Sequence, residues 1–172
     1  MHLLRSKWVL KKKKERNGAV ERYKSRLVSG EDEQVLGRYY NLTFSAALDM
    51  ISGKVILAVA RSRGIRARHY DVPSAYLKAY NKEDIDIYQR VPEGMSIPGE
   101  ELRRLEENDC NDVCLRLVKS LYGLKQAGRI WKQLLHQTLV QAGFTQSVTD
   151  ACVYYKVIGR GAIVVGVYVE DL

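Results

Sequence analysis

The chemically most suggestive residues in this 172-residue chain are two carboxylates, Glu170 and Asp171, which directly follow an apolar run from Ala162 to Val169. A β-branched run of this length, preceded by the turn Gly159-Arg160-Gly161, predicts a strand that is covered on both faces. Adjacent acids raise each other's pKa and repel one another unless a cation neutralises them. For these two acids alone, a solvated loop after a core strand is the better interpretation, and a metal site requires a third acid nearby.

Asp71 is the candidate for that third acid. It lies where a short strand, His69 to Asp71, is predicted to meet a helical turn that opens at Pro73. Taken alone, an aspartate at this position is expected to cap the helical turn.

The basic residues are concentrated near the N-terminus. Residues 1–26 hold ten Lys and Arg and two Glu, so they account for the whole net charge of +8. The other 146 residues hold 18 cations and 18 acids. A basic pole on a neutral body favours an anionic partner, with nucleic acid or nucleotide phosphates ahead of a membrane surface. A solvated lysine run explains the charge equally well.

A β-hairpin is predicted to carry this charge. One strand begins at Trp8, Asn17-Gly18 gives the turn, and the second strand runs from Val20 to Val28. Alternation places Arg22, Lys24 and Arg26 on one face and Tyr23 and Leu27 on the other. The three cations suit a triphosphate or a nucleic-acid backbone. The alternative is a strand face that is merely exposed.

The remaining pattern indicates a mixed α+β domain. A helix is expected after a cap at Thr43 or Ser45, with an inward stripe and an end at Gly64. A second helix has the stripe of Trp131 and Leu135 and ends at Gly143. Both apolar sets are predicted to be core: Leu48, Ile51, Val55 and Ala58 in the first helix, and Trp131, Leu134, Leu135, Thr138, Leu139 and Ala142 in the second. Strands are expected at 85–88, 113–117 and 150–155, whereas residues 95–112 and the acidic Glu31-Asp32-Glu33 are expected to be solvated surface.

Composition excludes several classes of protein. No apolar segment is long enough to span a bilayer and the first residues lack a signal-peptide core, so a cytoplasmic or nuclear chain without a membrane partner is expected. Cys110, Cys114 and Cys152 are predicted to be reduced thiols. A zinc site with His69 or His136 is the alternative, but it lacks a second close-spaced ligand pair.

Taken in order along the chain, several segments resemble the reverse transcriptase of copia-type LTR retrotransposons. The matching stretches are Lys7-Trp8-Val9, residues 20–28, Thr43-Phe44-Ser45, Asp71-Val72 with Ala75-Tyr76-Leu77, residues 91–94, residues 121–127 with Arg129 and Trp131, Gly143-Phe144, and residues 168–171. The runs ending in Leu27-Val28 and Gln126-Ala127 are the specific ones.

The resemblance implies the fingers and palm of a right-hand polymerase, cut before the thumb and RNase H domain. Residues 1–65 would form part of the fingers, and residues 66–172 a mixture of palm and fingers. The class activity is RNA-directed DNA synthesis, with an RNA or DNA template, a primer and dNTPs as partners, in an intracellular retroelement particle.

The resemblance also implies the site. Asp71, Glu170 and Asp171 correspond to the palm carboxylates that hold two Mg²⁺ ions. Lys24 and Arg26 correspond to triphosphate-binding residues, Tyr76 to the ring that rejects a ribose 2′-hydroxyl, and Gln126 to a residue beside the nascent base pair. Core packing is the alternative for Tyr76, and polarity at a helix entry is the alternative for Gln126. The cations expected to contact nucleic acid are Lys11, Lys12, Lys13, Lys14 and Arg22.

One departure bears on catalysis. The family has two aspartates after its Tyr-x pair, and here the first is Glu170. The extra methylene displaces the carboxylate by about 1 Å, a misplacement that can cost roughly 10²-fold in rate. We therefore expect impaired catalysis and better tolerance of Mn²⁺ than of Mg²⁺. A non-catalytic nucleic-acid-binding remnant of a retroelement is the alternative function.

Overall fold

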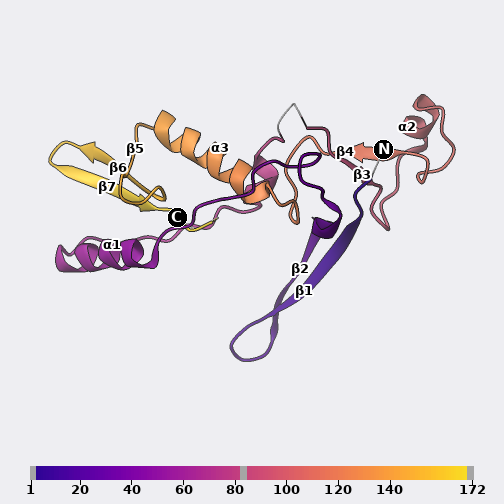
Figure 1. Cartoon of the computed structure of the whole chain (residues 1–172). Helices are drawn as coiled ribbons and strands as arrows, with labels where there is room; N and C mark the ends of the chain where they lie inside the picture. The colour runs from indigo at the N-terminus through magenta and orange to yellow at the C-terminus, as the bar shows by residue number, and fades with distance from the viewer. Residues whose placement is uncertain (1–2, 82–84, 170–172) are drawn as a thin grey trace. The chain divides into compact units, whose positions relative to one another are not determined.

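The computed structural model describes residues 3–81 and 85–169, and these fall into two compact units. Unit 1 comprises residues 1–43 and 76–127, and unit 2 comprises residues 44–75 and 128–172. Each unit mixes helices with small antiparallel sheets (Figure 1). The prediction of a mixed α+β chain is therefore confirmed.

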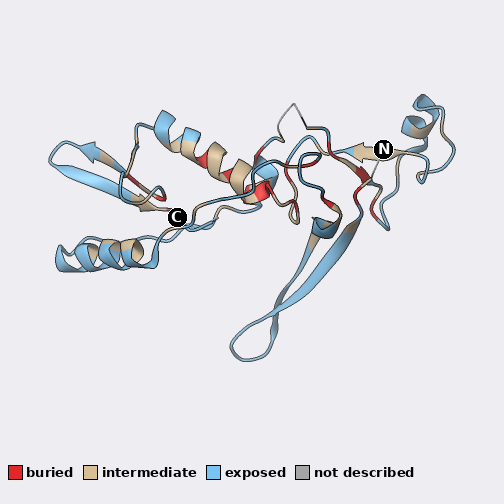
Figure 2. Cartoon of the chain, in the orientation of Figure 1, coloured by how far each residue is buried: buried red, intermediate tan, exposed pale blue. Residues whose placement is uncertain are grey.

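Unit 1 begins with the predicted hairpin. Strand β1 (Ser6–Lys14) pairs antiparallel with β2 (Val20–Ser29), and Gly18, with φ of 87°, lies in the turn between them. In Figure 1 the hairpin extends away from the other elements of its unit. Most of its residues are therefore exposed, and burial begins only at Arg26, near the end of β2 (Figure 2).

The core of unit 1 lies beyond the hairpin. It collects Leu4, Tyr39, Ile87, Leu124 and Ala127 from distant parts of the sequence. The elements around it are the short 3-10 helices η1 (Glu31–Glu33) and η2 (Ala75–Lys78), strands β3 (Tyr88–Arg90) and β4 (Cys114–Arg116), and helix α2 (Gly99–Arg104). Strand β3 pairs with β4, and the backbone of Leu4 bonds to Tyr88 and Arg90 on the other side.

Two predictions about unit 1 need correction, one about a strand and one about an acidic residue. Residues 95–112 are largely exposed, as predicted, and include the helix α2, but the strand expected at 85–88 is shifted to Tyr88–Arg90. Glu33 is not solvated, because its carboxylate accepts a hydrogen bond from the backbone N–H of Arg5 at 2.6 Å and pairs with the Arg5 guanidinium. This ion pair raises the pKa of Arg5 above its usual value.

Unit 2 contains a three-stranded sheet in the order β5 (Thr145–Gln146), β6 (Val153–Ile158), β7 (Gly161–Gly166). Helix α1 (Met50–Ser62) contacts β7. Leu48, just before this helix, also packs there, since a Cβ on Gly166 would stand 3.0 Å from its side chain. Helix α3 (Ala127–Gln141) contributes Trp131 and Leu135 to the buried residues, with Cys152, Tyr154 and Val167. The second helix and the strands on both sides of Gly159-Arg160-Gly161 are thus confirmed, although the strand expected at 150–155 lies at 153–158. The predicted core stripe of the helix is confirmed only in part, because Thr138 and Ala142 are exposed.

The beginning and the inward face of α1 differ from the prediction. Asp49 caps the helix, accepting hydrogen bonds from the backbone N–H groups of Ile51 and Ser52, so neither Thr43 nor Ser45 does. The predicted stripe is wrong as well, because Ile51, Val55 and Ala58 are exposed and Leu48 precedes the helix. The side of α1 that carries Ile56 faces the sheet instead, because the Ile56 side chain would lie 3.4 Å from a Cβ on Gly166.

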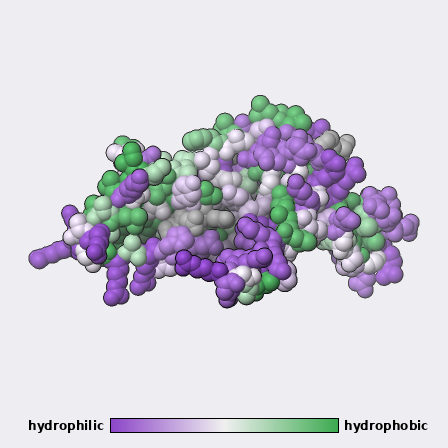
Figure 3. All heavy atoms as spheres, turned by 90° about the horizontal axis from the view of Figure 1, so that it is seen from below, coloured by the Kyte–Doolittle hydropathy of each residue, from purple (hydrophilic) through white to green (hydrophobic). Residues whose placement is uncertain are grey.

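The terminal strand is also less covered than predicted. In β7, residues 161–164 are exposed, because among the described residues the strand pairs only with β6 and meets α1 near its end. A run of β-branched residues shows that a strand forms but not that both faces are buried. Exposed hydrophobic side chains occur in both units, and Figure 3 shows green hydrophobic spheres interspersed with purple hydrophilic ones on one face.

Within residues 3–81 and 85–169, no helix is long and apolar enough to cross a membrane.

Candidate nucleotide-binding and carboxylate sites

The hairpin divides its cations between two faces. Cross-strand partners share a face, and β1 and β2 pair Lys11 with Lys24 and Lys13 with Arg22. Val9 lies opposite Arg26 on this face. The two strands therefore place six cations on one face: Lys7, Lys11, Lys13, Arg22, Lys24 and Arg26. The predicted grouping of Arg22, Lys24 and Arg26 agrees with this register.

The other hairpin face carries Lys12, whose ammonium lies 5.9 Å from the centre of the Tyr23 ring. Lys14 follows a shift in the strand register, between Lys13 and Lys14, and pairs with Val20. The lysine run at 11–14, which is predicted to contact nucleic acid as one set, is therefore divided between the two faces of the hairpin.

Most cations on the Lys11 face lie opposite like charges. A cation directly across from a cation destabilises a strand pair. Among the described residues, only Lys13 of this face forms an ion pair, with Glu21 at 2.9 Å. That hydrogen bond and ion pair hold the pKa of Glu21 below its usual value. A bound anion would relieve the repulsion among the other cations of this face.

Arg26 and Tyr76 are brought to the same aromatic ring. The Arg26 guanidinium carbon lies 4.9 Å from the centre of the Tyr122 ring. The rings of Tyr76 and Tyr122 are 5.1 Å apart at an interplanar angle of 49°. Tyr76 is partly buried and packs against the core of unit 1, which agrees with the alternative of a packing role. A candidate triphosphate ligand and a candidate sugar-contacting ring therefore lie within one small cluster.

Gln126 is buried, and both ends of its amide are engaged. Its oxygen accepts a hydrogen bond from Gln34 at 3.1 Å, and its nitrogen donates to the carbonyl oxygen of Tyr39 at 3.1 Å. Gln34 in turn accepts a hydrogen bond from the backbone N–H of Lys125 at 2.7 Å. In this arrangement Gln126 fastens the entry of α3 to residues 34–39, as the alternative of a helix-entry role anticipates.

Asp71 lies in unit 2 and is exposed. The strand expected at His69 to Asp71 is reduced to a single bridge residue at Asp71, and a turn at Pro73 and Ser74 leads into η2. No described residue donates a hydrogen bond to the Asp71 side chain, so the expected cap is not formed within residues 3–81 and 85–169. Toward residues 3–81 and 85–169, its two carboxylate oxygens are available to a cation.

The terminal acids, Glu170 and Asp171, lie outside the described residues. The chain just before them is held by α3, since the indole N–H of Trp131 donates a hydrogen bond to the carbonyl oxygen of Val169 at 2.9 Å. Among the described residues, no three His, Cys, Asp or Glu side chains lie close enough together to hold a metal ion. The three cysteines are free thiols.

A second group of polar residues supports unit 2. Burial raises the pKa of Asp150, but hydrogen bonds from the backbone N–H groups of Cys152 and Asp49 outweigh it, so that this pKa is lowered overall. Burial raises the pKa of Tyr154, whose hydroxyl lies 3.1 Å from Nδ1 of His136. These contacts join the strand β6 to α3 and to the beginning of α1.

Comparison with known proteins decides the family. The family described as reverse transcriptase (RNA-dependent DNA polymerase) matches residues 2–172. The chain belongs to the reverse transcriptase family. The prediction from the sequence motifs is thereby confirmed.

The similar curated proteins are retrovirus-related Pol polyproteins. The chain is 34% identical over 166 residues to that of transposon RE1 of Arabidopsis thaliana, covering 96% of this chain and 10% of the polyprotein. It is 34% identical over 170 residues to that of transposon TNT 1-94 of Nicotiana tabacum, covering 98% of this chain and 12% of the polyprotein. The chain thus corresponds to the reverse transcriptase domain of copia-type Pol polyproteins and spans about a tenth of their length. No solved structure matches it.

Tyr122 belongs to the family motif at residues 121–127, but the resemblance implies no role for it. The signal was present in the sequence, since an aromatic residue immediately before Gly123 lies in the run that leads to Gln126. Only the folded unit shows that its ring contacts both Arg26 and Tyr76.

Proposed function

We propose that this reverse transcriptase chain is a fingers-and-palm portion that binds a template, a primer and dNTPs for RNA-directed DNA synthesis. The observation that carries the proposal is the contact of Arg26 and Tyr76 with one ring, that of Tyr122. A nucleotide needs both a cation for its triphosphate and a shaped surface for its sugar, and this cluster offers the two side by side.

In this proposal Lys24 and Arg26 hold the triphosphate by charge-assisted hydrogen bonds, which are stronger than neutral ones. Tyr76 places its ring under the sugar and excludes a 2′-hydroxyl by steric overlap. Gln126 would contact the base pair only after giving up one of its two hydrogen bonds, to Gln34 or to Tyr39.

The carboxylates Asp71, Glu170 and Asp171 are the residues that would hold divalent metal ions. Carboxylate oxygens are the ligands that Mg²⁺ prefers, and the exposed Asp71 has both oxygens available among the described residues. Bound Mg²⁺ supplies charge that lowers the pKa of a primer 3′-hydroxyl and stabilises the leaving pyrophosphate. Among the described residues, the indole N–H of Trp131 holds the carbonyl oxygen of Val169, the residue directly before the two terminal acids.

Primer extension tests this function directly. The purified chain is incubated with an RNA template, a DNA primer and dNTPs in Mg²⁺ or Mn²⁺, beside Asp71→Asn and Glu170→Asp variants. We expect weak extension that Mn²⁺ enhances, loss of extension in Asp71→Asn, and a gain of about 10²-fold in Glu170→Asp. Extension that survives in Asp71→Asn, or no gain in Glu170→Asp, would contradict the assigned carboxylates.

A second candidate function is nucleic-acid binding without catalysis. The like-charge pairs Lys11–Lys24 and Lys13–Arg22 favour it, because a bound anion would relieve their repulsion and no metal ion is needed for this. Fluorescence anisotropy with a labelled template and primer should show affinity that falls steeply with salt. Each cation that neutralises a single-strand phosphate contributes about −0.7 to the slope of log affinity against log salt concentration, so Lys24→Gln should reduce that slope by about this amount. Such binding, with no extension in either metal by the chain or by Glu170→Asp, would establish the non-catalytic function instead.

A further inference from the structure

Tyr122 occupies a specific place in unit 1, because its ring contacts two residues that lie far apart in the sequence. The Arg26 guanidinium is 4.9 Å from the ring centre, within the range of a cation–π interaction. The Tyr76 ring lies at 5.1 Å with a tilted geometry, which is a favourable arrangement for two aromatic rings. Arg26 and Tyr76 are therefore linked through a third side chain.

The backbone holds Tyr122 against β2. The N–H of Ser29 donates a hydrogen bond to the carbonyl oxygen of Tyr122 at 2.8 Å. The next residue, Gly123, has φ of 87° and lies so close to β2 that a Cβ there would stand 2.7 Å from the Val28 side chain. Only glycine permits this approach. Residues 122 and 123 therefore lie directly against Val28 and Ser29, which follow Arg26 in β2.

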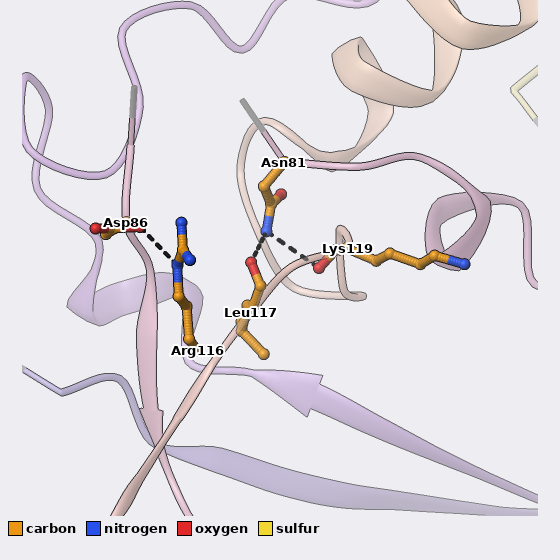
Figure 4. Close-up of polar contacts among 5 residues, drawn as sticks. All are labelled: Asn81, Asp86, Arg116, Leu117 and Lys119. Carbon is orange, nitrogen blue, oxygen red and sulfur yellow. Dashed lines mark hydrogen bonds and ion pairs between the residues drawn. The ribbon is translucent and has the colours of Figure 1, made fainter. Parts of the chain in front are cut away.

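A second set of contacts ties the segment that follows Tyr76 to residues 117–120, which lie between β4 and Tyr122. The N–H of Ser120 donates to the carbonyl oxygen of Ala79 at 2.8 Å, and the N–H of Asn81 donates to Val118 at 2.9 Å. Figure 4 shows the side-chain amide of Asn81 pointing at two further carbonyl oxygens, those of Leu117 at 2.7 Å and Lys119 at 3.1 Å. The short element η2 is thereby fixed to the same stretch of chain that presents Tyr122.

These contacts explain why the three side chains meet and why their spacing is fixed. Hydrogen bonds join residues 29, 79 and 81 to the single stretch 117–122. Moving Tyr122 would therefore move its contacts with both the arginine and the tyrosine. If Tyr122 only filled space in the core, its ring would need no cation beside it. The ring instead lies against the Arg26 guanidinium.

We infer that Tyr122 is a positioning residue for the proposed nucleotide site, holding the Arg26 guanidinium and the Tyr76 ring at a fixed separation. Triphosphate binding and the rejection of a ribose then depend on one another, because both partners are set by the same ring. This inference rests on the proposed function, in which Arg26 contacts the triphosphate and Tyr76 the sugar. Displacement of such groups by about 1 Å is enough to lower the efficiency of a positioned site.

The test uses isothermal titration calorimetry of the full chain with three probes: tripolyphosphate, dATP and ATP. Tripolyphosphate reports on the arginine, and the ratio of the ATP to the dATP dissociation constant reports on the sugar. The variants are Tyr122→Leu, which removes the ring, and Tyr122→Phe, which keeps it. The matched control is Tyr80→Leu, because Lys119 lies over the Tyr80 ring at 5.0 Å in the same unit.

We expect Tyr122→Leu to weaken tripolyphosphate binding about fivefold, the size of one exposed cation–π contact, and to reduce discrimination against ATP as well. Tyr122→Phe and Tyr80→Leu should stay within about twofold of the unchanged chain. A Tyr122→Leu chain that binds all three probes as before overturns the inference alone, and so does loss of triphosphate affinity with discrimination intact. An unchanged chain that binds none of the probes overturns the proposed function and this inference together.

A second measurement uses the chain without any change at Tyr122, so that it stands even if Tyr122→Leu fails to fold. The chain is labelled with 3-fluorotyrosine, and the Tyr76 and Tyr122 resonances are assigned from Tyr76→Phe and Tyr122→Phe samples. We expect tripolyphosphate to shift both resonances, and Arg26→Gln to abolish both shifts. A Tyr76 resonance that does not move while tripolyphosphate binds would overturn the coupling.

Discussion

The indole N–H of Trp131 donates a hydrogen bond to the carbonyl oxygen of Val169, with the nitrogen 2.9 Å from the oxygen. Trp131 is buried in α3, and Val169 is the last described residue before Glu170. Val169 has a positive φ of 57°, a conformation that β-branched residues rarely adopt. The helix therefore holds in place a strained turn at the end of the chain's last strand.

Trp131→Phe removes this hydrogen bond and keeps an aromatic ring in the core. We expect it to lower the free energy of unfolding by about 1–3 kcal/mol, because the Val169 carbonyl loses its partner and some packing is lost. Urea unfolding followed by far-UV circular dichroism measures the change. The control is Trp8→Phe, since the Trp8 indole N–H donates to Glu93 at an exposed site. A Trp131→Phe effect no larger than that of Trp8→Phe would contradict a supporting role for the bond.

Gly123→Ala tests the close approach of residues 122–123 to β2. An alanine there combines a positive φ with a Cβ that overlaps Val28 and the backbone of Ser29. Gly18 has the same φ of 87° with nothing within 4 Å, so Gly18→Ala isolates the cost of the backbone conformation. We expect about 1–2 kcal/mol for Gly18→Ala, and about 1–3 kcal/mol more for Gly123→Ala, in thermal or urea unfolding. Equal effects of the two variants would mean that the loop moves away from β2 without cost.

Asp49→Ala tests the beginning of α1. Its carboxylate accepts hydrogen bonds from Ile51 and Ser52, so the loss of this cap should cost about 1 kcal/mol of the free energy of unfolding. Asp49→Asn should retain most of the stability, because an amide oxygen also caps a helix well. Thr43→Ala, at the position that the sequence favoured, should change stability by less than about 0.5 kcal/mol. A larger loss of stability in Thr43→Ala than in Asp49→Ala would show that Thr43, and not Asp49, caps α1.

Asp150 predicts a dependence of stability on pH. Its folded-state pKa lies below the usual value of 3.8, since the backbone bonds from Cys152 and Asp49 outweigh burial. The unfolded chain therefore binds more protons in acid, so that the contribution of Asp150 is fully present above pH 3.8 and is lost as the pH falls through the folded pKa.

The measurement is the free energy of unfolding of Asp150→Asn and of the unchanged chain from pH 7 to pH 3. The variant should be less stable at pH 7, and the difference should shrink as the pH falls. The exposed Asp112 supplies the control variant, Asp112→Asn, which should track the unchanged chain throughout. A difference between Asp150→Asn and the unchanged chain that stays constant over this range would contradict the lowered pKa.

Local patterns in the sequence determined the hairpin, the turn at Gly18, the long helix around Trp131 and the family of the chain. These features depend on residues that are close together, such as a glycine at positive φ or an apolar stripe at helical spacing, so a single sequence reveals them. The family motifs are equally local, being short runs in a fixed order.

Only the tertiary structure decided which residues meet. The sequence could not show that Asp49 rather than Thr43 caps α1, because both residue types are suitable caps. Nor could it show that β7 is largely exposed, because an apolar strand has the same pattern whether its faces are covered or open. The contact of Tyr122 with Arg26 and Tyr76 spans almost a hundred residues and depends on hydrogen bonds between distant backbone segments. Long-range contacts of this kind follow from packing, which no local pattern encodes.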